Sequence, residues 1–120
     1  MARSILDEAR IHAGARERIG NYHLATVKEV QAAVAANDVV VVGMRMNPFP
    51  GKALKLLGDA GIAYKYLEYG SYLGEWRRRL AIKMWTGWPT FPQIFVKGVL
   101  IGGFSELEKL VESGEVARKA

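Results

Sequence analysis

The central architecture of this chain is indicated by one segment, Val39-Val-Val-Val-Gly-Met-Arg-Met-Asn-Pro-Phe-Pro-Gly-Lys-Ala-Leu-Lys-Leu-Leu57. It begins with a continuous β-branched run, Val39 to Val42, which is typical of a strand buried on both faces, as in the centre of a sheet. A short loop then leads to Asn47-Pro48, a favoured helix start, because asparagine caps free backbone N–H groups and proline suits the first helical position. The segment therefore predicts a central strand, a short loop and a helix from about Pro48 to Ala60.

Composition limits the class of protein. The chain has 120 residues, of which 50% are hydrophobic and 24% charged, which fits one globular domain. It contains no cysteine, so disulfides, zinc–thiolate sites and iron–sulfur clusters held by its own thiolates are excluded. No run approaches the ~20 apolar residues of a membrane span, and charges near the N-terminus argue against a signal peptide. We therefore expect a cytoplasmic protein that does not use a membrane as its partner.

The balance of charge is basic, with 17 lysines and arginines against 12 acidic residues and a net charge of +5. The densest basic run is Arg77-Arg78-Arg79, with Lys83 one turn later. A nucleic-acid surface would require a longer basic stripe with interleaved aromatics. An ordinary solvated surface, or a site for a small anion, explains these residues more simply, and we do not expect nucleic acid to be a partner.

Helical patterns precede the central segment. Residues 3–19 are rich in alanine and charge and are interrupted by Gly14, so we expect residues 1–22 to form an extension with some helix. A domain over residues 23–120 would follow. Thr26-Val-Lys-Glu29 fits a capping box, with a hydroxyl three residues before a carboxylate, and predicts a helix whose inward face carries Val27, Val30 and Val34.

Two elements are expected after the central helix. Residues 63–69 resemble a second strand, and residues 72–85 show a helical period. The period places a stripe of large apolar side chains on one face of that helix, and we expect the stripe to face the core: Leu73, Trp76, Leu80 and Met84. Trp85, beside the stripe, is expected in the core as well.

The last part of the chain changes from alternating strands and helices to a hairpin. Residues 93–96 and 99–101 are two short apolar runs around Lys97-Gly98, and Ser105-Glu-Leu-Glu108 fits a capping box at the start of a last helix. The order of elements is α-β-α-β-α-β-β-α, a βαβ unit followed by a ββα unit. It predicts an α/β protein of thioredoxin-like fold, with a four-stranded mixed sheet flanked by helices.

Three later motifs identify a family. They are Trp88-Pro-Thr-Phe-Pro-Gln93, then Gly102-Gly103, and finally Glu112-Ser-Gly-Glu115. Together they are similar to the motifs of glutaredoxins, especially of the monothiol branch, and the resemblance extends over residues 24–118. It implies the thioredoxin-like fold and a cis peptide bond between Phe91 and Pro92.

The resemblance places the two redox-cysteine positions of that family at Asn47 and Pro50, where a Cys-Pro-Phe-Cys turn is replaced by Asn-Pro-Phe-Pro. Glutaredoxin chemistry uses a thiolate stabilised at a helix N-terminus. An amide is not a nucleophile at sulfur, and proline has no N–H to offer such a thiolate. We therefore expect no thiol–disulfide enzyme, with Asn47 serving as a helix cap.

The resemblance also implies a partly preserved site for glutathione. Arg79 and Lys83 fall on family positions that hold the glycine carboxylate of the tripeptide, and their spacing of four places them on one helix face. Arg45 is the nearest substitute for a basic residue that precedes the redox cysteine in the family. No cofactor is required by this reading, and glutathione is considered only as a ligand.

Backbone groups would supply the other contacts with glutathione. By the resemblance, the residue before the cis-proline, Phe91, pairs its backbone with the cysteinyl part of the ligand, in a loop that contains Thr90 and Pro92. The N–H groups after the glycine pair, at Gly103, Phe104 and Ser105, would receive the γ-glutamyl carboxylate. The family usually has Cys-Asp where Phe104-Ser105 stand here, so the acid that takes the ligand's ammonium group is missing, and Ser105 is expected to cap the last helix.

The aromatic residues favour a rim around the vacated redox position. Trp88 is expected to line the groove, whereas Trp76 is expected in the core. Phe49, Trp88 and Phe104 together would form an apolar contact surface, although Phe104 in place of a small residue is equally compatible with a blocked groove. His12 and His23 lie in or near the extension without a serine or carboxylate partner and are interpreted as surface residues.

Several functions stay open at this point. The first is a redox-inactive protein that binds glutathione or a related anionic peptide, and the second is a protein-interaction module that uses the same groove or the N-terminal helix. Nucleic-acid binding through Arg77 to Arg79 is weaker. An accessory role in iron–sulfur or redox pathways would require every cluster ligand to come from glutathione or a partner.

Overall fold

A four-stranded mixed sheet lies at the centre of the structure, a computed structural model that describes residues 3–117. The strands stand in the order β2-β1-β3-β4, with bounds of Val39–Gly43 for β1, Lys65–Glu68 for β2, Gln93–Val96 for β3 and Val99–Gly102 for β4. β1 runs parallel to β2 and antiparallel to β3, and β3 and β4 form an antiparallel hairpin. The predicted thioredoxin-like topology, with the valine run as a central strand, is confirmed.

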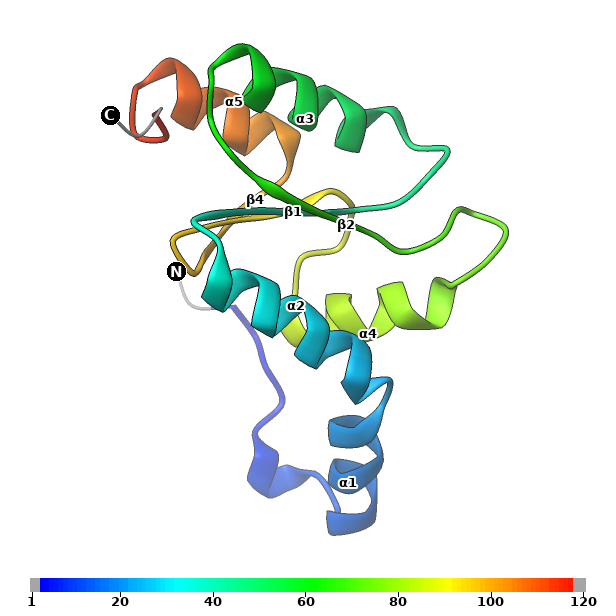
Figure 1. Cartoon of the computed structure of the whole chain (residues 1–120). Coiled ribbons are helices and arrows are strands. Elements are labelled where there is room, and N and C mark those ends of the chain that lie inside the picture. The colour runs from blue at the N-terminus through cyan, green and yellow to red at the C-terminus, as the bar shows by residue number, and fades with distance from the viewer. Residues whose placement is uncertain (1–2, 118–120) are drawn as a thin grey trace.

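Helices cover both faces of the sheet. They are the 3-10 turn η1 (Glu8–Arg10), α1 (Ala13–Asn21), α2 (Leu24–Ala36), α3 (Pro48–Asp59), α4 (Trp76–Thr86) and α5 (Phe104–Glu112). Figure 1 shows α3 and α5 on one face and α2 and α4 on the other, with α1 projecting beyond α2. Within residues 3–117, no helix is both long and apolar enough to cross a membrane.

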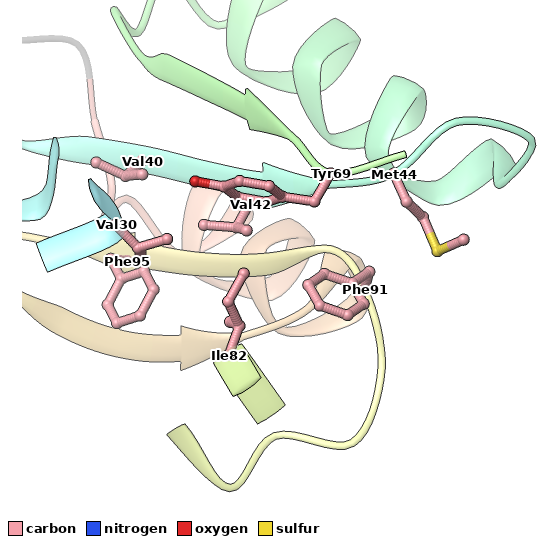
Figure 2. Packing of buried hydrophobic residues seen from close by; sticks show 8 residues of the cluster. All are labelled: Val30, Val40, Val42, Met44, Tyr69, Ile82, Phe91 and Phe95. Carbon is pink, nitrogen blue, oxygen red and sulfur yellow. The ribbon is translucent and has the colours of Figure 1, made fainter. Parts of the chain in front are cut away.

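Alternate valines of β1 supply the two halves of the core. Val40 and Val42 face α2 and α4, where they belong to a cluster with Val30, Met44, Tyr69, Ile82, Phe91 and Phe95 (Figure 2). Val39 and Val41 point to the opposite face and pack with Ala53, Leu57, Ile62, Ile94, Leu107 and Val116. All four valines are at most 5% exposed. The strand is therefore buried on both faces because successive side chains of a strand alternate in direction.

The capping box predicted at Thr26 to Glu29 is wrong. Helix α2 begins earlier, at Leu24, and Thr26 is a buried residue of its first turn. Its Oγ1 accepts a hydrogen bond of 2.9 Å from Nε of Arg78 on α4, and the Glu29 carboxylate accepts from the hydroxyl of Tyr69. These side chains therefore bind neighbouring elements, and the prediction failed because a local spacing does not reveal such partners.

The predicted capping role of Ser105 is also wrong. Helix α5 begins at Phe104, and the residue before it, Gly103, donates its backbone N–H to Oε1 of Glu106 at 3.0 Å. The helix therefore starts two residues earlier than the Ser-x-x-Glu pattern indicated, after a glycine, which is also accepted before a helix, and only the Glu106 half of a capping box is formed.

Helix α4 presents to solvent the face that was expected in the core. It begins at Trp76, and its buried residues are Arg79, Ala81 and Ile82. The predicted apolar stripe is exposed instead: Leu73 by 89%, Trp76 by 51%, Leu80 by 38% and Met84 by 47%. The expected core position of Trp85 is also wrong: it is 37% exposed, although its ring stacks on Phe95 of the sheet. The spacing identified a helix correctly, but a period alone does not tell which face turns inward.

Candidate functional site

Asn47 connects two segments at the start of α3. Its Oδ1 accepts a hydrogen bond of 3.0 Å from the N–H of Phe49, which confirms the predicted helix cap. Its Nδ2 donates to the carbonyl of Phe91 at 3.2 Å, in the loop that carries the cis Phe91–Pro92 bond. The second bond was not predicted from the sequence. The Asn47 amide is thus used by the fold on both its oxygen and its nitrogen.

Pro50, the second position at which the resemblance implies a redox cysteine, is fully buried. It packs on the end of β1 at Gly43, where an added Cβ would lie 2.9 Å from the Pro50 Cβ. Its ring therefore fills space between α3 and the sheet. With neither a side-chain polar group nor a backbone N–H, this position can contribute packing only.

Buried side chains fix the position of the loop before β3. The Phe91 ring is 6% exposed and lies in the core beside Ile82 and Val42 (Figure 2), so Phe91 contributes backbone to the surface. Gln93, fully buried, donates from Nε2 to the carbonyl of Trp88 at 2.9 Å, and its Oε1 accepts from the Thr86 hydroxyl at 2.7 Å. Gln93 positions the loop, a role that its place in the Trp-Pro-Thr-Phe-Pro-Gln motif signalled but that we did not predict.

A groove of about 400 Å³ lies where the starts of α3 and α5 meet this loop. Most of its lining is aromatic, proline or backbone, and the residues are Asn47, Pro48, Phe49, Tyr72, Trp88, Thr90, Phe91, Pro92, Gly103, Phe104, Ser105 and Glu106. The Phe49 and Phe104 rings face each other with centroids 6.2 Å apart. The structure therefore gathers six of the nine predicted ligand residues in one groove, together with the predicted aromatic rim.

Two residues of the groove were missed by the sequence analysis. Tyr72 was assigned to a helix, but it lies in the turn before α4 and is 64% exposed. Glu106 was placed at the start of the last helix without a role in the groove, although its spacing from Gly103 was available as a capping signal. Glu106 matters for the chemistry, because it places a carboxylate at a helix N-terminus that would otherwise attract an anion.

The three predicted cationic residues do not line the groove. The Arg79 side chain is only 7% exposed, and its Nη1 donates to the carbonyls of Tyr69 at 2.9 Å and Gly74 at 2.6 Å. Arg45 lies on the surface, with Nε 3.8 Å from a carboxylate oxygen of Glu68. Lys83 is half-buried, with Nζ 5.7 Å from the centre of the Phe91 ring, and the unpredicted Lys52 lies closer to the lining, with Nζ 4.8 Å from the centre of the Phe49 ring. Arg79 thus has a structural role, and Lys83 remains beside the cis-proline loop.

The basic run on α4 is not a continuous surface. The guanidinium of Arg77 lies 4.4 Å from the centre of the Trp76 ring, whereas Arg78 binds Thr26 and lies within 3.8 Å of Glu29 and 3.4 Å of Glu75. Arg79 is buried, as described above. Successive residues of a helix point in different directions, and here the arginines contact a ring, two carboxylates and a loop.

One polar atom next to the groove has no partner within the described residues. The indole Nε1 of Trp88 is buried without a hydrogen bond. It lies near Gly103, since a Cβ added to that glycine would be 3.6 Å from it. A Cβ at that distance would be in ordinary van der Waals contact with the ring, so the indole packs beside the start of α5.

Comparisons with known proteins agree with this geometry. The family model described as glutaredoxin matches residues 39–101. A glutaredoxin-like protein of Dictyostelium discoideum is 51% identical over 96 residues, covering 80% of this chain and 78% of the relative. A probable monothiol glutaredoxin 2 of Rickettsia prowazekii is 30% identical over 94 residues, covering 74% of this chain and 85% of the relative.

Longer relatives and solved structures complete the comparison. The chain spans only 20% of the length of glutaredoxin 3 from Danio rerio, which it also matches. The crystal structure of a buckwheat glutaredoxin–glutathione complex has the same fold, with a TM-score of 0.68 and 23% identity over 82% of this chain and 86% of that chain. On its topology, its motifs and these relatives, the chain belongs to the glutaredoxin family.

Proposed function

We propose that this chain acts by binding and not by thiol–disulfide exchange, and that its groove receives glutathione or a related anionic peptide. The observation that carries the proposal is the state of Asn47, whose amide holds the start of α3 and the Phe91 carbonyl at once. A carboxamide in that position supplies neither a nucleophile nor a leaving group for sulfur exchange. The groove around it, in contrast, keeps its aromatic and backbone surfaces.

The ligand would lie along the cis-proline loop. An extended peptide backbone at Thr90 and Phe91 pairs with the loop, and its carboxylate meets the first N–H groups of α5 at Phe104 and Ser105. The neighbour from buckwheat was solved as a complex with glutathione, which supports a peptide of this size as the ligand. Lys83, close to the Phe91 ring, is the cation that we assign to the second carboxylate of the ligand.

The affinity is expected to be modest. Arg79 is engaged with the carbonyls of Tyr69 and Gly74, so the ligand loses a bidentate partner. Glu106 already takes the N–H of Gly103 and repels an incoming carboxylate. With these two losses we expect a dissociation constant of roughly 1 mM, which corresponds to about 4 kcal/mol.

Titration of the full chain with reduced glutathione, followed by amide NMR shifts, tests this proposal. Shifts are expected at Thr90, Phe91 and Ser105. The affinity derived from them should fall several-fold in Lys83→Ala. Lys28→Ala is the matched control, because Lys28 is an exposed lysine on another helix. Glutathione would be contradicted as the ligand if no shifts occurred at concentrations about tenfold above the expected dissociation constant. Equal affinity of Lys83→Ala and Lys28→Ala would also contradict it.

The absence of redox activity is tested separately, with Asn47→Cys. A thiol at this helix start should gain some thiolate character from the helix N-terminus. Pro50 offers it no N–H, so we expect only feeble reduction of a mixed disulfide with glutathione in a single-turnover assay. Asn47→Ser is the control without a thiol. Exchange by the unchanged chain at the rate of an enzyme would disprove the binding-only role.

A protein-interaction module is the second candidate, and the aromatic rim favours it. Phe49 is 46% exposed and stands opposite Phe104 at the mouth of the groove. An apolar side chain of a partner protein would bury both rings, which is typical of interface anchors. A flat glutathione titration, combined with intact folding, would favour this candidate over the first.

A further inference from the structure

The outer face of α4 is a second contact surface that the groove does not use. We define the α4 stripe as Leu73, Trp76, Leu80 and Met84. On the helix, the last three are spaced by four residues and therefore share one side. That side is opposite the buried Ile82, and its three residues are 38–51% exposed, while Leu73 in the preceding turn is 89% exposed. A row of large apolar side chains pointing away from the core marks an interaction site more often than a chance exposure.

The composition of this face is that of a protein interface. Tryptophan, methionine and arginine are enriched at interface cores, and tryptophan and arginine dominate binding energy there. Arg77 lies beside the stripe with its guanidinium 4.4 Å from the centre of the Trp76 ring, which orders both side chains. A rigid aromatic with a fixed cation beside it loses little conformational freedom on binding.

Charge selects the kind of partner. The α4 sequence, Trp-Arg-Arg-Arg-Leu-Ala-Ile-Lys-Met-Trp-Thr, contains no acidic residue, and Glu75 before it pairs with Arg78. Arg77 on one flank and Lys83 on the other therefore border the stripe with positive charge. A second copy of this chain would bring these cations against one another, which disfavours self-association through this face.

We propose that the α4 stripe docks an acidic amphipathic helix of a partner protein. An apolar ridge with a four-residue period packs into a groove between the ridges of another helix. Carboxylates that flank the partner's apolar side chains would meet Arg77 and Lys83, so the contact would be specific for an acidic helix and sensitive to salt. The inference shares Lys83 with the proposed glutathione site, but no residue of the α4 stripe lines the groove, so Leu80→Ser tests it separately from glutathione binding.

A designed pair of peptides tests the proposal on the full chain. The probe is a synthetic helix of about 21 residues with leucine at positions a and d of each heptad and glutamate at e and g, and its counterpart has lysine at e and g. The acidic peptide is expected to shift the Trp76 indole signal and to bind at least about tenfold more tightly than the basic one. Leu80→Ser should weaken it about tenfold, and Arg77→Glu should reverse the preference between the peptides.

Val99→Ser is the matched control, because Val99 is 62% exposed on β4 and lies outside the stripe. Its affinity for the acidic peptide should equal that of the unchanged chain. Equal binding of both peptides, or no binding at about 1 mM, would overturn the proposal. So would self-association of the chain that Leu80→Ser abolishes, since a second copy would then be the occupant. Binding to phosphatidylglycerol vesicles without binding to the peptide would assign the stripe to a membrane surface and would equally overturn it.

Discussion

Asn47 illustrates how a single residue can change the use of a site. Its two hydrogen bonds join segments 44 positions apart in the sequence, the start of α3 and the cis-proline loop. A cysteine in that place would cap the helix poorly and would leave the Phe91 carbonyl to a ligand. Asparagine fills both roles from within the chain, so the position has become part of the fold.

Substitutions at Asn47 separate the two bonds. Asn47→Ala removes both, and we expect the free energy of unfolding to fall by about 1–2 kcal/mol, from the cap and the bond to Phe91 together. Asn47→Asp keeps the cap but turns a carboxylate oxygen toward the Phe91 carbonyl, so a smaller loss is expected. Urea unfolding of the two variants measures the difference. If both variants lose the same free energy of unfolding, the cap hydrogen bond that aspartate keeps does not contribute to stability.

Arg79 is predicted to act on stability, contrary to the ligand role that the resemblance implies. Arg79→Ala leaves the carbonyls of Tyr69 and Gly74 without their donor and opens a cavity, so we expect a loss of about 2–4 kcal/mol in the free energy of unfolding. Arg77→Ala, on the exposed side of the same helix, is the control and should change it by less than about 0.5 kcal/mol. Denaturant unfolding measures both losses. Equally small losses in the two variants would show that the buried hydrogen bonds of Arg79 are weak.

At the scale of elements, two glycines with different backbone conformations provide a matched pair. Gly98, in the turn between β3 and β4, has a φ of 81°, which L side chains rarely adopt. Gly98→Ala should lower the free energy of unfolding by about 1 kcal/mol. Gly51 lies within α3 with no atom near an added Cβ, so Gly51→Ala should raise it by about 0.5–1 kcal/mol. Thermal or urea unfolding measures both changes. If the free energy of unfolding changed in the same direction in both variants, this interpretation of the two conformations would be contradicted.

The elements differ in how far their sequences determined them. The strand from Gln93 to Val96 and the start of α3 at Pro48 were predicted with the bounds that the structure has. Both depend on strictly local signals, a short apolar run before a turn and an asparagine-proline cap. The capping boxes at Thr26 and Ser105 failed for different reasons. Thr26 binds Arg78 on another helix, whereas α5 begins before Ser105, with Glu106 accepting from the N–H of Gly103.

At the scale of the whole molecule, buried tyrosines make stability depend on alkaline pH. Burial, followed by the charge of Glu68, raises the pKa of Tyr66 to about 12. Burial also raises the pKa of Tyr69, with a further contribution from its hydrogen bond to Glu29. The folded chain therefore holds these phenolic protons more tightly than the unfolded chain, whose tyrosines titrate near pH ~10.

The sign of the effect follows from that difference. The stabilisation is fully present below about pH 10 and is lost as the pH rises from about 10 toward 12 and above, because the unfolded chain releases the protons first. Unfolding in urea at several pH values in this range should show a falling stability. Tyr69→Phe should make the fall shallower, whereas Tyr64→Phe, at an exposed tyrosine, should leave it unchanged. A pH-independent stability would contradict the proton linkage.

The N-terminal extension is predicted to be dispensable for the fold. Neither η1 nor α1 contains a buried residue, and the link from Arg3 Nη1 to the Thr86 carbonyl is on the surface. A chain of residues 23–120 should therefore keep its circular dichroism spectrum and unfold within about 0.5 kcal/mol of the full chain. A loss of several kcal/mol would place the boundary of the folding unit earlier than residue 23.

The sequence by itself determined the order of strands and helices, the central position of the valine run and the absence of any cysteine thiol. These follow from local patterns, in which hydrophobic period, caps and residue identity act over a few positions. Only the tertiary structure decided that Arg79 is buried, that Asn47 reaches Phe91, and that the apolar side of α4 faces solvent. The reason is that a helix with apolar residues on more than one side has several ways to pack, and the choice among them depends on partners far away in the chain.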